Sequence, residues 1–221
     1  MLARLHDPIV ALLSIGLAAL LLQFARWTQR EHPLPPFLFR KLLHALIGAA
    51  TLTMTALFHR RGWAMAPPAL FAALNASPRL RAYVPGLAEN AKEARGLWMF
   101  PLGVSLVCLF FWGSAPHGAV YAGIAALAFG DPAAALVGTH WGQRRYTRWA
   151  YGRSVEGSLA FLLAAGIATA VIAALCPGGP SPVRAGVGCG VIGAIAEAIS
   201  PAGVDNLTIP ILVAAAYQLL S

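Results

Sequence analysis

Side chains that could bind a metal ion and a phosphate group gather in one stretch of this sequence, from Phe129 to Ser158. The stretch holds two of the eight acidic residues and four of the 16 Lys and Arg residues, although the chain around it is strongly apolar. Carboxylates are hard oxygen ligands of the kind Mg²⁺ prefers, and arginines bind phosphate oxygens. An apolar scaffold does not require these charges, so they indicate a functional site.

Asp131 is the first candidate. A carboxylate inside a membrane span costs about 2.5–3.5 kcal/mol on insertion scales, so one that is kept is usually paired and functional. Gly130 could end the incoming helix, Asp131 could cap the next one, and Pro132 suits a first helical position. We therefore predict a broken helix whose second half directs its N-terminus at an anion. The alternative is a buried Asp bonded to a neighbouring helix without chemistry.

The rest of the stretch offers phosphate and metal contacts. Gly138 and Gly142 lead into a basic loop, which predicts phosphate binding, whereas G-x-x-x-G alone indicates close helix packing. The sequence has no G-x-x-x-x-G-K-[ST], which excludes a P-loop. Ser154 is a predicted N-cap, with a phosphate-binding cation before it and a metal-binding carboxylate after it; an ordinary helix start is the alternative. The cations of the basic loop are Arg144 and Arg145, and the residues that flank Ser154 are Arg153 and Glu156.

Three further clusters lie at the ends of apolar runs. Arg40 and Lys41 precede His44 by about one helical turn, so the three share a face; membrane anchoring and a packed neutral His are the alternatives. Arg95 belongs to a second cluster, Lys92-Glu93-Ala94-Arg95-Gly96. Glu197 ends one run, and Asp205-Asn206 begin another, where turn chemistry alone is the alternative for Asn206 and Pro210.

The elements that must position these residues are membrane helices. The chain of 221 residues is 58% hydrophobic and 11% charged, with a mean hydropathy of +0.68, which is outside the range of soluble domains. We predict a single all-α membrane domain over 1–221, a polytopic bundle of seven or eight spans with broken helices at the cytoplasmic side. The predicted runs are 8–25, 38–58, 63–77, 97–113, 117–138, 157–176, 183–199 and 206–220.

The net charge of +8 reflects membrane topology rather than nucleic-acid binding. Placing alternate loops on one side puts Arg4, Arg60, Arg61 and Arg184 on one face and the other twelve of the 16 Lys and Arg residues on the opposite face. The positive-inside bias then predicts a multi-pass protein with both termini away from the cytoplasm. All acidic residues except Asp7 fall on the cytoplasmic side. Cys108, Cys176 and Cys189 are predicted to be packing thiols.

Four motifs resemble the polyprenol kinase family, which includes phytol and farnesol kinases, dolichol kinase and CTP-dependent diacylglycerol kinases and is related to phosphatidate cytidylyltransferases. They are R-K-x-x-H at 40–44, F-G-D-P-A-A-A-L-V-G-x-x-x-G at 129–142, R-S-V-E-G-S at 153–158 and E-x₇-D-N-L-T-I-P at 197–210. The resemblance implies transfer of the γ-phosphoryl group of CTP, or less often another nucleotide, to a membrane lipid alcohol with Mg²⁺. The family commonly has Lys at the position of Arg153.

The charges then divide by role. We expect Asp131 and Asp205 to bind Mg²⁺ or orient the lipid hydroxyl, Glu156 and Glu197 to support them or bind metal, and His44 to act as a base or phosphate contact. The expected nucleotide and phosphate contacts are Arg40, Lys41, Arg95, Gly138, Gly142, Arg144, Arg145, Arg153 and Asn206. The alternatives are cytidylyl transfer from CTP to a lipid phosphate and a small anion carrier or channel. The short chain favours phytol, geranylgeraniol or farnesol.

Overall fold

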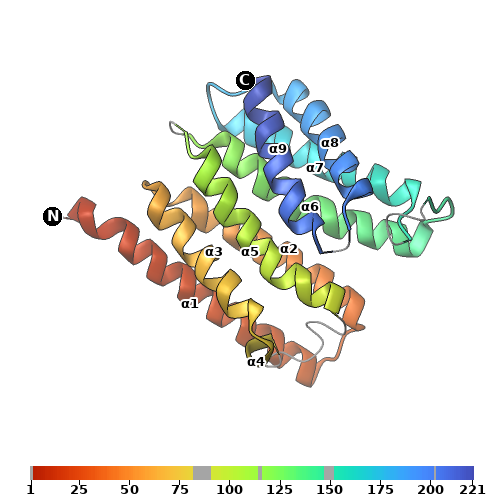
Figure 1. The fold of residues 1–221 in the computed structure, drawn as a ribbon, viewed down its shortest axis with the longest axis horizontal. Helices are drawn as coiled ribbons and strands as arrows, with labels where there is room; N and C mark the ends of the chain where they lie inside the picture. Colours follow the sequence, from red (N-terminus) through yellow and green to blue (C-terminus); the bar gives the residue numbers. More distant parts are fainter. Residues whose placement is uncertain (1, 82–90, 114–115, 147–151, 202) are drawn as a thin grey trace.

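The computed structural model describes residues 2–81, 91–113, 116–146, 152–201 and 203–221. Their regular elements are helices, apart from one isolated β-bridge between Arg145 and Ser154, so the all-α fold class is confirmed. Figure 1 shows the helices, of which α4 is a single turn. They are α1 (Leu2–Glu31), α2 (Pro36–Ala56), α3 (Arg61–Ala76), α4 (Pro78–Arg81), α5 (Ala91–Phe111), α6 (Gly118–Trp141), α7 (Val155–Leu175), α8 (Pro182–Ile199) and α9 (Asp205–Leu220).

Each of the eight predicted apolar runs coincides with a helix. Six helices, α1, α2, α5, α6, α7 and α8, are long and apolar enough to cross a membrane. The other two, α3 and α9, have 16 residues each. At about 1.5 Å per residue they extend about 24 Å, less than a hydrocarbon core of about 30 Å. The protein is therefore a multi-pass membrane protein, and the choice between seven and eight spans stays a prediction.

Helix α6 lies at the centre of the fold. It packs against α2, α7 and α9, and nearly every side chain from Val120 to Ala128 is fully buried. Small residues permit this close packing, because Gly48 of α2 meets Ala128 and Gly123 meets the Pro210 carbonyl of α9 with no space for a Cβ. Helix α6 is thus fixed on three sides, and a side chain projecting from it has a defined position.

The predicted break at Gly130-Asp131-Pro132 is wrong, because α6 is continuous through these residues. Pro132 removes one backbone hydrogen bond, a loss that a helix packed on three sides tolerates. Gly130 serves packing, since a Cβ there would lie 2.8 Å from the ring of Phe161 on α7. Asp131 therefore projects from the middle of an unbroken helix, and no helix N-terminus at this position is directed at the site.

A true interruption separates α8 from α9. Helix α8 ends at Ile199 and α9 begins at Asp205, and the turn between them contains Gly203 with a φ of 87°, which favours glycine. The Ser200 and Thr208 hydroxyl groups are 2.7 Å apart and tie the two helices together. The predicted helix boundary between Glu197 and Asp205 is confirmed.

Two smaller predictions are also confirmed. The Ser154 hydroxyl caps α7 by accepting the backbone N–H of Gly157 at 3.1 Å. The three cysteines are buried and free, as packing thiols should be.

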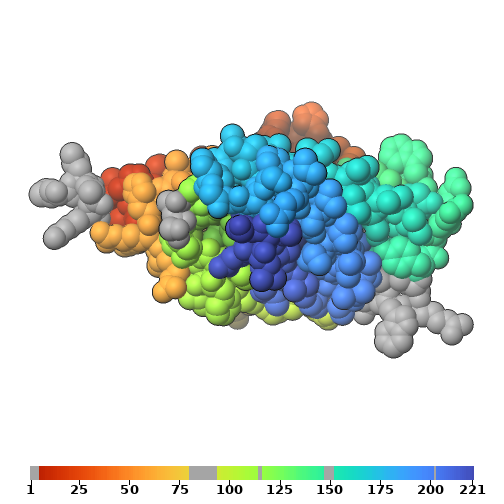
Figure 2. Space-filling view, turned by 90° about the horizontal axis from the view of Figure 1, so that it is seen from above, coloured from red at the N-terminus to blue at the C-terminus, as the bar shows by residue number. Residues whose placement is uncertain are grey.

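The molecule is elongated, with its N-terminal helices toward one end. Figure 2 shows the end of α6 and the start of α7, in green and cyan, projecting at the opposite end, with α8 and α9 covering the middle of this face. Helix α1 lies at the edge of the bundle and packs mainly against α2 and α3. This edge position makes α1 one wall of the cavity described next.

Candidate functional site

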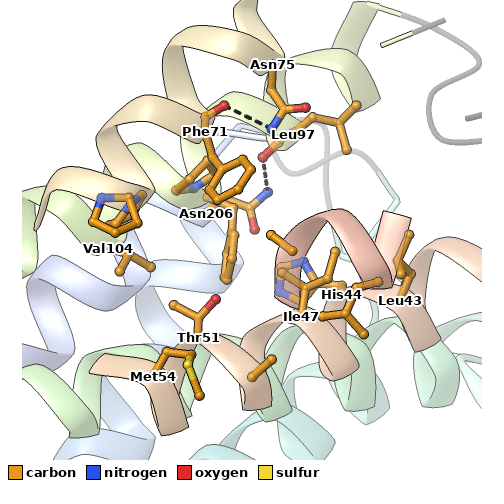
Figure 3. Close-up of a pocket in the computed structure, with 18 of the residues that line it drawn as sticks. Leu43, His44, Ile47, Thr51, Met54, Phe71, Asn75, Leu97, Val104 and Asn206 are labelled. Carbon is orange, nitrogen blue, oxygen red and sulfur yellow. Dashed lines mark hydrogen bonds between the residues drawn. The ribbon is translucent and has the colours of Figure 1, made fainter. Parts of the chain in front are cut away.

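A largely apolar cavity of about 400 Å³ lies among α1, α2, α3 and α5. Ser14, Leu17 and Leu21 line it from α1, and Phe71 and Val104 line it from α3 and α5. Figure 3 shows the side chains of α2 and α3 facing each other across it. Phe58 lines the cavity just beyond the end of α2, and the α2 side chains recur at helical spacing along almost the whole helix: Lys41, His44, Ile47, Thr51, Met54 and Thr55. The cavity is therefore a groove that follows the length of α2.

One end of this groove is charged. Lys41 Nζ donates to Asp131 Oδ2 at 2.8 Å, and His44 Nε2 lies 3.9 Å from the same oxygen. The side chains of Lys41 and Asp131 are 23% and 14% exposed, so the pair is largely removed from water. The R-K-x-x-H spacing on α2 thus brings Lys41 and His44 to the carboxylate of α6, as the shared helix face predicts.

His44 presents a free nitrogen to this region. Its Nε2 is buried, has no hydrogen-bond partner and lies on the side of the ring that faces Asp131. A neutral imidazole with its proton on Nδ1 carries a lone pair on Nε2, which can accept a proton. The Phe100 ring holds the imidazole in an edge-on contact, with centroids 5.0 Å apart. The arrangement fits a proton acceptor beside Asp131.

Arg153 joins two of the predicted carboxylates. Its Nε lies 3.1 Å from Glu197 Oε1, and one terminal nitrogen donates to Asp205 Oδ2 at 2.7 Å. The other terminal nitrogen, NH1, is buried without a hydrogen-bond partner. The break between α8 and α9 thus places two carboxylates beside one guanidinium group. The NH1 group of that guanidinium remains available to donate further hydrogen bonds.

Asn206 closes the charged end of the groove from α9. Its Nδ2 donates to the Gly96 carbonyl of α5 at 3.5 Å, and its Oδ1 is buried without a partner. Asn206, Asp205 and Asp131 line the same cavity. The carbonyl contact fixes the orientation of the amide, so an oxygen donor faces the groove beside two carboxylates.

Sequence reasoning did not identify a hydroxyl network next to Glu197. Ser158 donates to Glu197 Oε2 at 3.0 Å and makes a very short contact with the Tyr146 hydroxyl. Ser158 follows the Ser154 cap by one helical turn, so it shares the inward face of α7. The four-residue spacing of Ser154 and Ser158 was the sequence pattern that could have identified Ser158. With Arg153, these hydroxyls hold the Glu197 carboxylate in one orientation.

The other predicted residues lie apart from the charged end, except Arg40, which lines the cavity. The backbone N–H of Arg144 donates to both Glu156 oxygens at 3.3 Å, and the Arg144 side chain is exposed. Arg145 is exposed next to the bridge with Ser154. Glu156 and Arg95 do not line the cavity. Lys92 and Glu93 lie outside the residues whose side chains the structure describes.

Gly138 and Gly142 take part in helix packing. A Cβ at Gly138 would lie 3.2 Å from the Ser154 hydroxyl oxygen, and one at Gly142 would lie 2.6 Å from the same atom. The end of α6 therefore packs directly on the start of α7. No contact among the described residues supports phosphate binding by these glycines, so that role stays a prediction.

The fold and this site together define a multi-pass membrane protein whose apolar groove leads to a buried cluster of acids, cations and one histidine. A phytol kinase of Synechocystis sp. is 31% identical to this chain over 180 residues, which cover 80% of this chain and 76% of that protein. The chain therefore belongs to the phytol kinase family of polyprenol kinases. No family model matches the chain, and no solved structure matches it.

Proposed function

We propose that this protein phosphorylates a membrane prenol, using the γ-phosphoryl group of a nucleoside triphosphate, with CTP as the expected donor. The observation that carries the proposal is the continuity of one cavity. The same groove is lined by apolar side chains of four helices and, at one end, by Lys41, His44, Asp131, Asp205 and Asn206. A lipid alcohol with its chain in the groove would place its hydroxyl among these groups. The similarity to a phytol kinase supports the same reaction class.

The length of the groove favours a prenol of about 20 carbons. From Lys41 to Thr55, α2 rises about 21 Å at about 1.5 Å per residue. An extended hydrocarbon advances about 1.25 Å per carbon, given C–C bonds of about 1.5 Å, so the 16 main-chain carbons of such a prenol extend about 20 Å. A farnesyl chain would reach about 15 Å and leave the far end empty. A dolichol would have to leave the groove.

The proposed reaction is an in-line displacement. The prenol oxygen attacks the γ-phosphorus, the bond from that phosphorus to its bridging oxygen breaks, and the nucleoside diphosphate leaves with that oxygen. His44 Nε2, which is buried without a hydrogen-bond partner, accepts the hydroxyl proton. The Asp131 carboxylate, 3.9 Å from that nitrogen, stabilises the resulting imidazolium.

Cations at the charged end would hold the triphosphate. Lys41 and Arg40 line the cavity, and Arg153 NH1 is buried with its donors unused. Positioning and charge stabilisation provide most of the catalysis of phosphoryl transfer, so such cations account for much of the expected rate.

The donor set also fits Mg²⁺. Asp131 and Asp205 provide carboxylate oxygens, and the unpartnered Asn206 Oδ1 provides a neutral oxygen in the same cavity. When bound there, Mg²⁺ would neutralise charge on the phosphate oxygens. Glu197, held by Arg153 and Ser158, would support this set rather than bind the ion directly.

A reconstitution experiment tests the proposal. Purified protein in vesicles is given Mg²⁺, each γ-labelled nucleoside triphosphate in turn, and prenols of about 10, 15 and 20 carbons. Labelled lipid phosphate should form fastest with the longest of these alcohols and with CTP. If no lipid alcohol is phosphorylated by any of the nucleotides, the proposal is wrong.

A further inference from the structure

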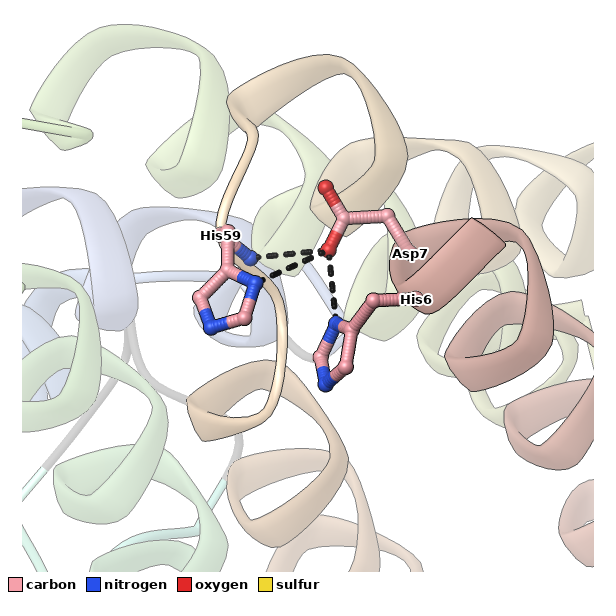
Figure 4. Close-up of side chains that lie close together, drawn as sticks. All are labelled: His6, Asp7 and His59. Carbon is pink, nitrogen blue, oxygen red and sulfur yellow. Dashed lines mark hydrogen bonds and ion pairs between the residues drawn. The ribbon is translucent and has the colours of Figure 1, made fainter. Parts of the chain in front are cut away.

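A second cluster of possible ligands lies far from the charged end of the groove. His6 and Asp7 lie near the start of α1, and His59 lies in the turn between α2 and α3 (Figure 4). Helix α2 separates the two places, because Lys41 lies near its beginning and His59 lies beyond its end. From Lys41 to Ala56 the helix rises about 22 Å. The cluster therefore belongs to a different site.

The three side chains converge on one oxygen atom. Figure 4 shows both imidazole rings directed at the Asp7 carboxylate. His6 Nδ1 lies 3.2 Å from Asp7 Oδ1, and His59 Nδ1 lies 3.7 Å from the same atom. One nitrogen or oxygen from each residue lies within 4.8 Å of the others. The imidazole rings are 4.2 Å apart between centroids and tilted by 32°, so both present Nδ1 to the carboxylate.

Hydrogen bonding alone does not account for this convergence. The buried Asp7 carboxylate, 4% exposed, already accepts the backbone N–H of His59 at 3.0 Å. A third donor is unnecessary for that oxygen, and 3.7 Å is too long for a hydrogen bond from His59 Nδ1. Ligands bound tetrahedrally at about 2.0–2.2 Å, in contrast, are about 3.4 Å from one another. The spacing in the cluster is close to that of ligands around one ion.

We propose that His6, Asp7 and His59 bind one divalent transition-metal ion of the Zn²⁺ type. Two imidazole nitrogens and a carboxylate oxygen form a ligand set that suits such an ion, with water as the fourth ligand. The side chains of His6 and His59 are 40% and 71% exposed, so an ion can enter from solvent. The buried Asp7 provides a fixed charge beneath them.

The bound ion would connect the start of α1 to the α2–α3 turn. Helix α1 packs mainly against α2 and α3, and Ser14 and Leu17 line the groove about two and three turns after the cluster. Metal binding would therefore hold α1, which lines the groove, against the α2–α3 turn at the end opposite the charged residues. We expect this to appear as a higher thermal stability of the whole protein.

Metal titration of the tag-free, EDTA-treated full-length protein tests the proposal. Co²⁺ serves as the spectroscopic probe, since its visible absorption reports coordination geometry, and Zn²⁺ is then used to displace it. We expect one equivalent to bind, with visible bands of four-coordinate Co²⁺ and a rise in Tm on addition of Zn²⁺. His6→Ala and His59→Ala should each weaken binding about 100-fold and abolish the rise in Tm.

Matched variants separate this site from others. His32→Ala removes an exposed imidazole near the other end of α1, and His44→Ala removes the histidine at the charged end of the groove. Both should bind Co²⁺ as the unaltered protein does. Because His6 and His59 are partly exposed, their alanine variants should keep the metal-free Tm and remain informative. The absence of saturable Co²⁺ binding, or binding unchanged in both cluster variants, would overturn the proposal.

Discussion

The ion pair between Lys41 and Asp131 allows the catalytic and structural roles of the charged end to be separated. Lys41→Met leaves a carboxylate without its partner, and Asp131→Asn leaves an ammonium group without its partner. The double variant removes both charges while approximately conserving the volume. We expect each single variant to be less stable and less active, and the double variant to regain stability but not activity.

The magnitudes follow from the geometry of the pair. At 2.8 Å and an effective dielectric constant of about 20, the gross attraction is about 6 kcal/mol, most of which offsets desolvation. Removing one partner of a buried pair costs about 3–5 kcal/mol of unfolding free energy, whereas removing both is often nearly neutral. Loss of one group that stabilises transition-state charge lowers kcat about 10²–10³-fold.

The assay combines thermal unfolding with initial rates of prenol phosphorylation in the same vesicles. Arg30→Met serves as the control, because Arg30 is an exposed cation in the last turn of α1 and should change neither quantity much. A double variant that recovers activity together with stability would show that the pair is only structural. A single variant with more than a tenth of normal activity would also contradict the proposed roles.

Substitutions at three further positions, two of them with a companion variant, test separate parts of the account. Thr51→Trp should block the groove about 15 Å from Lys41 and shift preference at least tenfold from 20-carbon to 10-carbon alcohols in a competition assay; an unchanged ratio would place the chain elsewhere. Arg153→Met should lower the unfolding free energy by about 3–5 kcal/mol and the activity at least 100-fold. Arg153→Lys should keep a tenth or more of the normal activity, and an equal loss of activity in the two variants would contradict this. Gly130→Ala should cost about 1–3 kcal/mol through contact with Phe161, and Phe161→Leu should restore most of it; an alanine variant of normal stability would refute the packing role.

The sequence predicts the helices and much of the charged cluster because both depend on short-range periodicity. Apolar runs mark the helices, and the four-residue spacing places Lys41 and His44 on one face. The pairing of these residues with Asp131 links positions far apart in the chain, and the family motifs indicated that they act together. The helix boundary between Glu197 and Asp205 was likewise recognisable from the sequence. In the structure both carboxylates contact Arg153.

The remaining features depend on packing that no local pattern encodes. Gly130 and Pro132 are typical of a helix break, yet the neighbouring Phe161 ring explains the glycine and tertiary contacts keep α6 continuous. The groove is formed by four helices whose apolar faces resemble lipid-facing surfaces. Its lining therefore could not be distinguished from the outside of the bundle before the helices were assembled.

Transfer from doubly labelled CTP tests the central claim most directly. The protein is reconstituted with a 20-carbon prenol and Mg²⁺, and CTP carries distinct labels on its α- and γ-phosphorus atoms. Only the γ-label should enter the lipid, as a monophosphate, and Asp131→Asn should reduce its transfer at least 100-fold. Entry of the α-label into lipid with release of pyrophosphate, or γ-transfer unaffected by Asp131→Asn, would contradict the account.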